Sequence, residues 1–282
     1  MCGLFGWNLE KHVPKRNKKQ LNRLATALML QNVFRGDDSW GFYSPNVDRR
    51  TVGLGDMSLM SNRSRGRLLD SEILIAHTRK ATTGDVSLDN CHPFRIGTLV
   101  GAHNGMVFNH SRLNHTYKRQ CNVDSEHIFY HLAEGRELCD ITAYGAIVYH
   151  DKSSPFPIEL AVFNNGELGI AHIKDVGVVW SSDKTHLKRA LALSGWKYDK
   201  IEEPYEDLIY SVESTGIDIH TEIKVDEPYY ETEFTRWRSY QSTGSCFSLN
   251  KVKDMKDDDD EPAQKALTAY PDDSTWPYAI GD

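Results

Sequence analysis

Apolar residues recur at helical spacing in a long segment near the start of the chain. Leu21, Leu24, Ala25 and Leu28 follow one another at steps of three and four residues, so they share one face of a helix. We therefore predict a helix from about residue 17 to residue 34, with this apolar face against the core.

Two further helices are predicted from polar caps. Asp124 opens a predicted helix over residues 124–137, and Ser181-Ser182-Asp183 precedes one over residues 184–193. Side chains of this type accept hydrogen bonds from the free N–H groups of a first helical turn. Residues 11–19, by contrast, are basic and contain a proline, which is typical of a solvated loop.

Short apolar runs elsewhere in the chain predict strands. The first begins at Leu4-Phe5-Gly6, directly after the N-terminus. Alternating apolar residues from Ile217 to Val225 predict a half-buried strand. Four runs separated by turns such as Asn164-Asn165-Gly166 are interpreted as one antiparallel meander: 144–149, 158–163, 168–173 and 176–180. Because helices and strands come in mixed order, we predict a layered α+β domain rather than a doubly wound sheet.

Polar residues directly follow two of the predicted strands. His77-Thr78-Arg79 comes after residues 74–76, and His103-Asn104-Gly105 comes after residues 99–101. Polar groups at strand ends commonly form sites. A third polar segment, residues 35–41, is interpreted as a turn that ends the first long helix, with Gly36 in the left-handed position.

Composition and charge narrow the class of protein. The chain has 282 residues, 39% of them hydrophobic, and a formal net charge of -7. This composition fits an ordinary globular protein, and the negative charge argues against nucleic-acid binding. With no apolar run of membrane-spanning length and no signal-peptide pattern, we expect a cytoplasmic protein that does not bind membranes.

The C-terminal part of the chain has a different composition. From residue 251 onward it becomes acidic, and residues 257–261 form a run of five like charges. A run of this kind is typical of a flexible, solvated tail. We therefore predict one domain over residues 1–250 and an acidic tail over residues 251–282.

Cysteine usage indicates a reducing compartment. The chain has five cysteines, an odd number, with no CxxC or Cys/His ligand spacing. We therefore expect no structural zinc and no cofactor, and we interpret Cys91, Cys121, Cys139 and Cys246 as buried or incidental thiols.

Cys2 differs from the other cysteines because of its position. If Met1 is removed, Cys2 carries a thiol and a free α-amino group on the same carbon. A thiol with a pKa near ~8.5 can then lose its proton to an amine with a pKa near ~8, without a distant histidine. Gly3 is expected to let a substrate approach closely.

The polar segments supply the other groups that hydrolysis of a free amino-acid amide needs. The Asn104 side chain and the Gly105 backbone N–H can stabilise the oxyanion that forms when a thiolate attacks an amide carbon. Arg79 can hold an α-carboxylate through its guanidinium fork, and Thr82 or Thr83 can add a hydroxyl. Asp124 can hold an α-ammonium group.

These segments together resemble the class II glutamine amidotransferases, whose glutaminase domain is an N-terminal-nucleophile (Ntn) hydrolase. The matching segments, in the family's order, are 2–6, 35–41, 76–84, 90–94, 103–105 and 124–126. The resemblance is strong over the first half of the chain and weaker to about residue 193. It implies a four-layer αββα sandwich and hydrolysis of glutamine, with Cys2 as nucleophile, Asn104 and Gly105 as oxyanion hole, and Arg79 and Asp124 as glutamine clamps.

The sequence departs from the family pattern in two respects. Lys80 and Thr83 stand where many members have an aromatic residue and a histidine. The chain also has no room for an acceptor domain, so we expect a glutaminase that passes ammonia to a separate acceptor synthetase.

Two alternative functions remain open. The first is an Ntn amidase that acts on another amide, and the second is a catalytically idle binding protein with the same fold. Retention of both Arg79 and Asp124 favours free glutamine, because a peptide substrate lacks one or both α charges. His77, His92 and His103 could be mistaken for a metal triad, but all lie in segments that the resemblance explains without metal.

Overall fold

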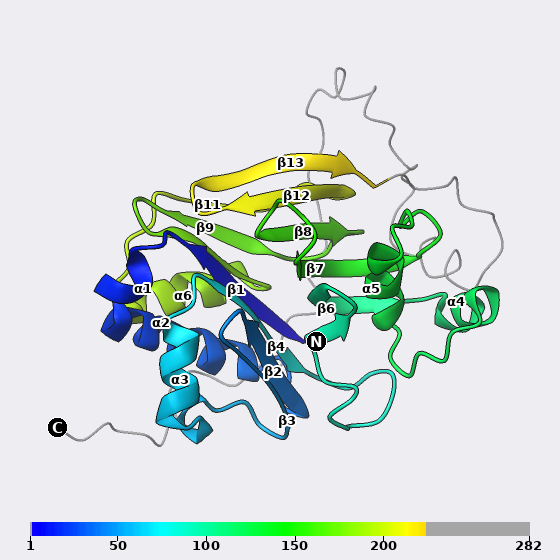
Figure 1. Ribbon diagram of the computed structural model, residues 1–282, viewed down its shortest axis with the longest axis horizontal. Coiled ribbons are helices and arrows are strands. Elements are labelled where there is room, and N and C mark those ends of the chain that lie inside the picture. The colour runs from blue at the N-terminus through cyan, green and yellow to red at the C-terminus, as the bar shows by residue number, and fades with distance from the viewer. Residues whose placement is uncertain (1, 224–282) are drawn as a thin grey trace, which may run out of the picture. The chain divides into compact units, whose positions relative to one another are not determined.

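The computed structural model describes residues 2–223, which form two antiparallel sheets with helices on their outer faces (Figure 1). Sheet A contains, in spatial order, β11 (Lys200–Glu202), β9 (Gly169–Ile173), β10 (Gly177–Ser181), β1 (Gly3–Leu9), β4 (Ile73–Arg79), β2 (Ser39–Ser44) and β3 (Val47–Val52). Sheet B contains β13 (Gly216–Glu222), β12 (Leu208–Glu213), β8 (Ile158–Phe163), β7 (Ala143–Asp151), β6 (Leu99–Val107) and β5 (Phe94–Ile96). The helical segments are α1 (Val13–Arg16), α2 (Lys18–Val33), η1 (Met57–Leu59), α3 (Asn62–Leu69), α4 (His110–Tyr117), α5 (Glu126–Ala133) and α6 (Lys184–Ser194).

Three apolar clusters define the layers. One joins α2, α3 and α6 to the outer face of sheet A, as in the packing of Leu28 and Phe42. The second lies between the sheets and includes Ile75 from sheet A and Val148 from sheet B. The third joins sheet B to α4 and α5, with Phe129 at its centre. The four-layer αββα sandwich is therefore confirmed.

The alternation of side chains along β4 decides which way its polar residues point. Ile75 lies in the cluster between the sheets, whereas Ala76 lies in the cluster beneath the helices. Because successive side chains of a strand point to opposite faces, His77 and Arg79 point toward sheet B and Thr78 points toward α2. The same rule applies to β6: Val100 lies between the sheets, so Asn104 also points toward sheet A.

The two polar triplets therefore each carry side chains into the space between the sheets: His77 and Arg79 from β4, and Asn104 from β6. They lie within β4 and β6, which end at Arg79 and Val107, and not after the strands as the sequence predicts. The hydrophobic run stops earlier than the strand because the last part of each strand carries polar side chains into the space between the sheets.

Most predicted helices are present. The long helix α2 and the helix α6 are confirmed, and the Asp183 carboxylate accepts hydrogen bonds from the N–H groups of Thr185 and His186. The predicted loop over residues 11–19 is wrong in part, because α1 and the start of α2 lie within it. Proline is tolerated there because it occupies the first turn of α1.

The prediction of a single meander is wrong. β7 pairs with β8 in sheet B, whereas β9 pairs with β10 in sheet A. The segment containing Asn164 and Asn165, both with positive φ (40° and 61°), therefore crosses between the sheets and does not close a hairpin. The strand predicted from Ile217 to Val225 is present as β13, although Ile219 is 60% exposed, and Val225 lies outside the described residues.

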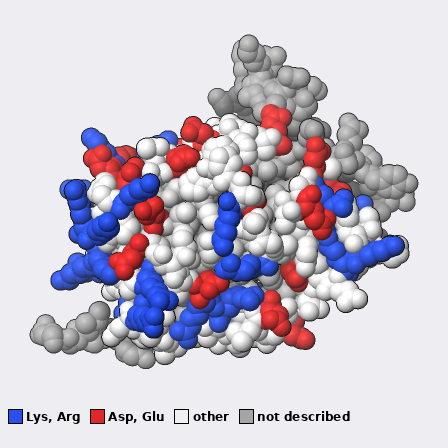
Figure 2. All heavy atoms as spheres, viewed as in Figure 1, with Lys and Arg blue, Asp and Glu red and all other residues white. Residues whose placement is uncertain are grey.

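Charge is distributed unevenly over the surface. Lys and Arg side chains gather over α1, α2 and α3 (Figure 2), and these helices contain no acidic residue. Within the described chain, no helix is long and apolar enough to cross a membrane. The predicted boundary at residue 250 and the acidic tail over residues 251–282 lie outside the described residues.

Candidate active site

The thiol of Cys2 lies where β1 and β4 meet. Gly3, the first residue of β1, pairs with Thr78, so Cys2 lies beside the end of β4. The backbone N–H of Lys80 donates to Sγ at 3.3 Å, and Sγ lies 3.5 Å from the Lys80 carbonyl oxygen. The backbone just after β4 therefore fixes the position of the thiol.

Two charged side chains lie near enough to act on this thiol. Burial raises the pKa of Cys2, and the carboxylate of Asp124 raises it further, while the Lys80 N–H and the positive charge of Arg79 oppose the shift. Cys2 lies beside the end of β4, which carries Arg79, and Asp124 is bonded to the end of β6, a strand that packs against β1 and β4.

Arg35 holds the main chain of Cys2. Its Nε donates to the Cys2 carbonyl oxygen at 2.8 Å, and its Nη1 lies 3.4 Å from Oδ2 of Asp183. The side chain of Arg35 is only 9% exposed, so this bond is largely shielded from water. A charge-assisted hydrogen bond of this kind fixes a backbone group more firmly than a neutral one.

Two glycines allow close packing beside Cys2. A Cβ on Gly3 would lie 2.6 Å from Oγ1 of Thr78. We expected this space to be open to a substrate, but protein atoms fill it. A Cβ on Gly36 would lie 2.5 Å from the carbonyl carbon of Arg79. Gly36 does not have the positive φ that we predicted. Its role is to let the segment after α2 touch the end of β4.

The same segment braces the backbone after β4. Oδ2 of Asp38 accepts a hydrogen bond from the N–H of Ala81 at 2.8 Å, and the Asp38 N–H donates to the Arg79 carbonyl at 3.0 Å. The ammonium group of Lys80 lies 2.9 Å from Oδ1 of Asp37. The predicted turn over residues 35–41 thus ends at Ser39, where strand β2 begins. Asp38 holds the backbone on both sides of Lys80, whose N–H donates to the thiol.

The guanidinium group of Arg79 organises the loop that follows β4. Its Nη2 donates to the carbonyl oxygens of Thr83 at 2.5 Å and Gly84 at 3.4 Å, and its Nη1 donates to that of Asp85 at 3.1 Å. Arg79 is 3% exposed, Thr82 is exposed and Thr83 is half-buried. The guanidinium has further N–H groups that could meet a carboxylate.

Asn104 and Gly105 lie on β6, opposite β4. Asn104 is 8% exposed, and β6 packs against both β1 and β4. Gly105 pairs with Gly145 of β7, and a Cβ on Gly105 would lie 1.9 Å from the Tyr144 carbonyl oxygen. Only glycine therefore fits at this point of β6.

Asp124 does not cap α5, as we predicted. The residue before α5 is Ser125, and no side chain caps the helix. Instead, Oδ2 of Asp124 accepts a hydrogen bond from the backbone N–H of Val107 at 2.6 Å. Asp124 is 4% exposed, so a buried carboxylate ties the end of β6 to the start of α5.

The three histidines of the polar segments contact one another and the backbone. Nε2 of His77 lies 3.1 Å from the carbonyl oxygen of His103, and Nδ1 of His92 lies 3.1 Å from both ring nitrogens of His77. Burial lowers the pKa of His77 to about 3 and also lowers those of His92 and His103. Among residues 2–223, no group of three or more His, Cys, Asp or Glu side chains is arranged to hold a metal ion.

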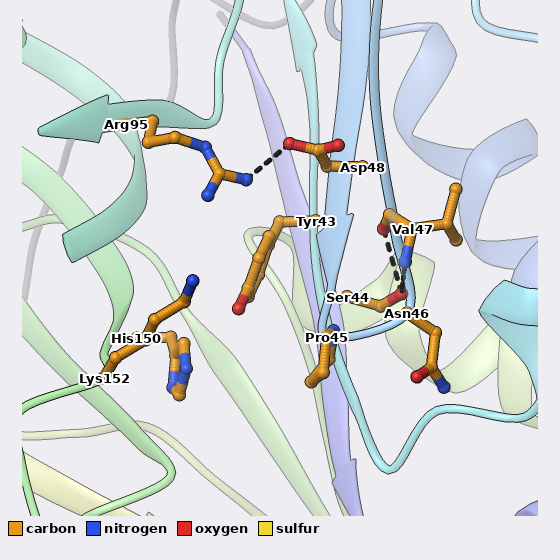
Figure 3. A pocket seen from close by; sticks show the side chains of 9 residues that line it. All are labelled: Tyr43, Ser44, Pro45, Asn46, Val47, Asp48, Arg95, His150 and Lys152. Carbon is orange, nitrogen blue, oxygen red and sulfur yellow. Dashed lines mark hydrogen bonds and ion pairs between the residues drawn. The ribbon is translucent and has the colours of Figure 1, made fainter. Parts of the chain in front are cut away.

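A cavity of about 300 Å³ lies away from this site, at the opposite end of β2 (Figure 3). Ser39 pairs with Arg79 at the site, whereas Tyr43 pairs with Ile75 and lines the cavity. Arg95 forms an ion pair with Asp48 at its rim. The cavity is therefore separate from the thiol.

Sequence reasoning assigned no individual role to Arg35, Asp38 or His77. Arg35 and Asp38 belong to a motif that carries the resemblance, but only the folded chain places them against the backbone of residues 2 and 81. In the sequence, Arg35 and Asp38 appear only as a pair of charged residues within a short turn. That pattern is also typical of a solvated surface.

Comparison with known proteins identifies the fold and a matching family. Residues 37–140 match the family model for class-II glutamine amidotransferases. Amidophosphoribosyltransferase from Mus musculus is 32% identical over 135 residues, which are 42% of this chain and 25% of the mouse protein. Glutamine–fructose-6-phosphate aminotransferase (isomerizing) from Encephalitozoon cuniculi is 27% identical over 213 residues, 63% of this chain and 30% of that protein.

Solved structures agree on the architecture. Glutamine phosphoribosylpyrophosphate amidotransferase from B. subtilis superposes with a TM-score of 0.55 at 18% identity, over 80% of this chain and 50% of the other. A structure described as the allosteric regulatory enzyme of purine biosynthesis gives a TM-score of 0.56. The chain thus shares the fold of these structures, and its residues 37–140 match the class II glutamine amidotransferase family. It spans a quarter to a half of the length of these relatives.

Proposed function

We propose that the chain hydrolyses glutamine to glutamate and ammonia through a γ-glutamyl thioester on Cys2. The observation that supports this proposal is that the Cys2 thiol is bonded to the backbone just after Arg79, at the end of β4, in a chain whose residues 37–140 match the glutamine amidotransferase family. β6, which bears Asn104, packs against both β1 and β4.

The reaction begins with removal of Met1, which frees the α-amino group of Cys2. That amine takes the thiol proton, and Sγ attacks the side-chain amide carbon of glutamine to give a tetrahedral oxyanion. The proton then passes to the nitrogen, the C–N bond breaks, and ammonia leaves. Water attacks the thioester in the same way and releases glutamate and the free thiol. Because burial raises the pKa of the thiol, a base on the same residue is important.

The oxyanion and the α charges of glutamine each have a partner in this scheme. The Asn104 side-chain amide and the Gly105 N–H donate to the oxyanion, where donors act most strongly in the transition state. Arg79 meets the α-carboxylate, helped by hydroxyls of Thr82 or Thr83. Oδ1 of Asp124 meets the α-ammonium group, while Oδ2 keeps its bond to Val107.

Ammonia would pass to a separate acceptor synthetase. The candidate contact is the acidic segment over residues 251–282, because opposite charge speeds the encounter of an acidic segment with a basic surface. Co-purification from the native host with and without these residues tests this part. Equal recovery of all partners would contradict it.

The central test combines mass and activity. Intact mass is expected to show loss of Met1 and one adduct from a diazo-ketone analogue of glutamine, and Cys2→Ser is expected to abolish that adduct. Glutamate release from glutamine, with asparagine and a γ-glutamyl amide as controls, separates the glutaminase from an amidase of other specificity. A protein that keeps Met1 in cells, or that takes no adduct, contradicts the mechanism and favours an idle binding protein.

A further inference from the structure

The strand that carries Asn104 and Gly105 has an open edge at the site. β5 pairs with β6 only from Leu99 to Gly101. In an antiparallel ladder, carbonyl groups of successive residues point alternately to the two sides of a strand. The carbonyl of His103 points away from β7, to the side where β5 has already ended, so within the described chain no strand is paired with it there.

The side chain of His77 supplies the hydrogen-bond donor that a neighbouring strand would otherwise offer to the His103 carbonyl. It projects from β4 of the opposite sheet, and its Nε2 lies 3.1 Å from the His103 carbonyl oxygen. A carbonyl oxygen can only accept, so Nε2 of His77 carries the hydrogen. His77 has no exposed surface, and in such a setting an unmade hydrogen bond is costly.

Neighbouring groups hold both partners of this bond. The ring of His92 meets that of His77 edge-on, with centroids 4.2 Å apart and an interplanar angle of 77°. The ring of His103 is fixed at its two nitrogens, because Nε2 lies 3.1 Å from the Tyr144 carbonyl oxygen and Nδ1 lies 2.9 Å from Oγ of Ser125. The peptide that leads into Asn104 is therefore fixed from β4, from β7 and from the start of α5.

We propose that His77 is a positioning residue for the oxyanion hole. By donating from Nε2 to the His103 carbonyl, it sets the distance between Asn104 and Gly105 on β6 and the thiol beside β4. It touches neither the substrate nor the thiol in this role, which rests on the function proposed above. Burial keeps His77 uncharged, with a pKa of about 3, so the Nε2 donor is unchanged at neutral pH.

The test compares two substitutions of similar size. His77→Gln places an amide N–H near the position of Nε2, whereas His77→Met fills the space without a donor. For His77→Met we expect kcat for glutamate release to fall by about tenfold to a hundredfold, because a small displacement of a catalytic donor has effects of that order. The KM for glutamine should change by less than about twofold, since the α charges keep their partners. His77→Gln should recover most of the lost kcat.

Hydrogen exchange gives a second measurement that does not require activity. Amides of residues 101–107 should exchange faster in His77→Met than in the wild type and in His77→Gln, while those of β1 should not change. Wild-type kcat in a folded His77→Met protein, or unchanged exchange in β6, would overturn the proposal. If His77→Met does not fold, His77→Asn, whose amide is too short to reach, replaces it against His77→Gln.

The two proposals fail in different ways. If the wild type releases no glutamate and Cys2 takes no adduct, the proposed function is wrong, and hydrogen exchange alone decides whether His77 holds β6. If the wild type is active and His77→Met lowers KM and kcat together, or changes only KM, then the role of His77 in positioning the oxyanion donors is wrong.

Discussion

The charged side chains that lie near the two ends of β2 differ in what they bind and in how far they are buried. At the site end, the backbone of Cys2 and the backbone of Val107 are held by the charged side chains of Arg35 and Asp124, both largely buried. At the cavity end, Arg95 pairs with an aspartate at the surface, and the two side chains are 43% and 59% exposed. Hydrogen bonds to charged groups contribute about 1.5 to 3 kcal/mol, whereas exposed ion pairs contribute about 0 to 1 kcal/mol.

This difference predicts that the site end resists displacement more strongly than the cavity end. Arg35 and Asp124 bond to backbone groups beside the start of β1 and at the end of β6, which cannot move without shifting a strand. Charged side chains at the cavity end bond to each other and can separate into water at little cost. Substitutions at the site end should therefore change activity or stability strongly, and those at the cavity end should change little.

Asn104→Ala is expected to have the largest effect. The oxyanion exists only near the transition state, so loss of the side-chain donor should lower kcat by about a hundredfold or more and leave KM for glutamine nearly unchanged. Steady-state kinetics of glutamate release measure both constants. A change confined to KM would show that Asn104 binds the substrate and not the oxyanion.

Arg79→Lys is expected to lower kcat/KM for glutamine by about tenfold to a hundredfold. An ammonium group keeps the charge but cannot form the bidentate fork, and a charge-assisted pair is worth about 1.5 to 3 kcal/mol. The same change removes donors from the carbonyls of Thr83 and Asp85. Circular dichroism and a melting curve separate loss of binding from loss of the loop, and unaltered kinetics would exclude Arg79 as a clamp.

Gly36→Ala should destabilise the protein by about 1 to 3 kcal/mol, the usual cost of overpacking. A new Cβ would lie 2.5 Å from the carbonyl carbon of Arg79 and 2.7 Å from the backbone nitrogen of Lys80. That nitrogen holds the thiol, so activity should fall as well. Gly66→Ala is the matched control, because nothing lies within 4 Å of a Cβ there. Equal urea midpoints for the two variants would contradict the close approach.

Acid should destabilise the histidine cluster at the site. Burial holds the pKa of His77 at about 3 and lowers those of His92 and His103, whereas in the unfolded chain they return to about 6.5. The unfolded state therefore binds more protons below pH ~6.5, and stability falls as the pH drops from there toward 3. Each histidine contributes up to about 1.4 kcal/mol per pH unit. Urea unfolding at pH 7, 6 and 5 measures the slope, and a flat profile would mean that the cluster is not buried and neutral.

The parts of the fold that depend on local motifs could be predicted from the sequence. The helix pattern from Leu21 to Leu28 and the cap at Asp183 depend on neighbouring residues only, and both predictions are confirmed. Asp124 is different: its partner Val107 lies 17 residues earlier. A buried carboxylate bound to a distant N–H and a helix cap have the same local sequence, so the pattern favoured the cap.

The crossing between the sheets could not be predicted from the sequence either. Asn164-Asn165-Gly166 has the composition of a hairpin turn, but a Cβ on Gly166 would lie 2.0 Å from the carbonyl oxygen of Gly145. That contact with β7 directs the chain from sheet B toward sheet A. It depends on residues about twenty positions apart, and a turn composition carries no information about them.

Arg95→Ala, at the cavity end, should have the smallest effect. Its ion pair with Asp48 is exposed, so its loss should change the free energy of unfolding by no more than about 0.5 to 1 kcal/mol. The guanidinium also lies 5.5 Å from the ring centre of Tyr43, and Asp48→Asn separates the two terms because it keeps this ring contact. Urea unfolding and kcat/KM should be nearly the same for both variants and the wild type. A tenfold loss of activity in Arg95→Ala alone would show that the ring contact at the far end of β2 is transmitted to the thiol, and that the two ends are not independent.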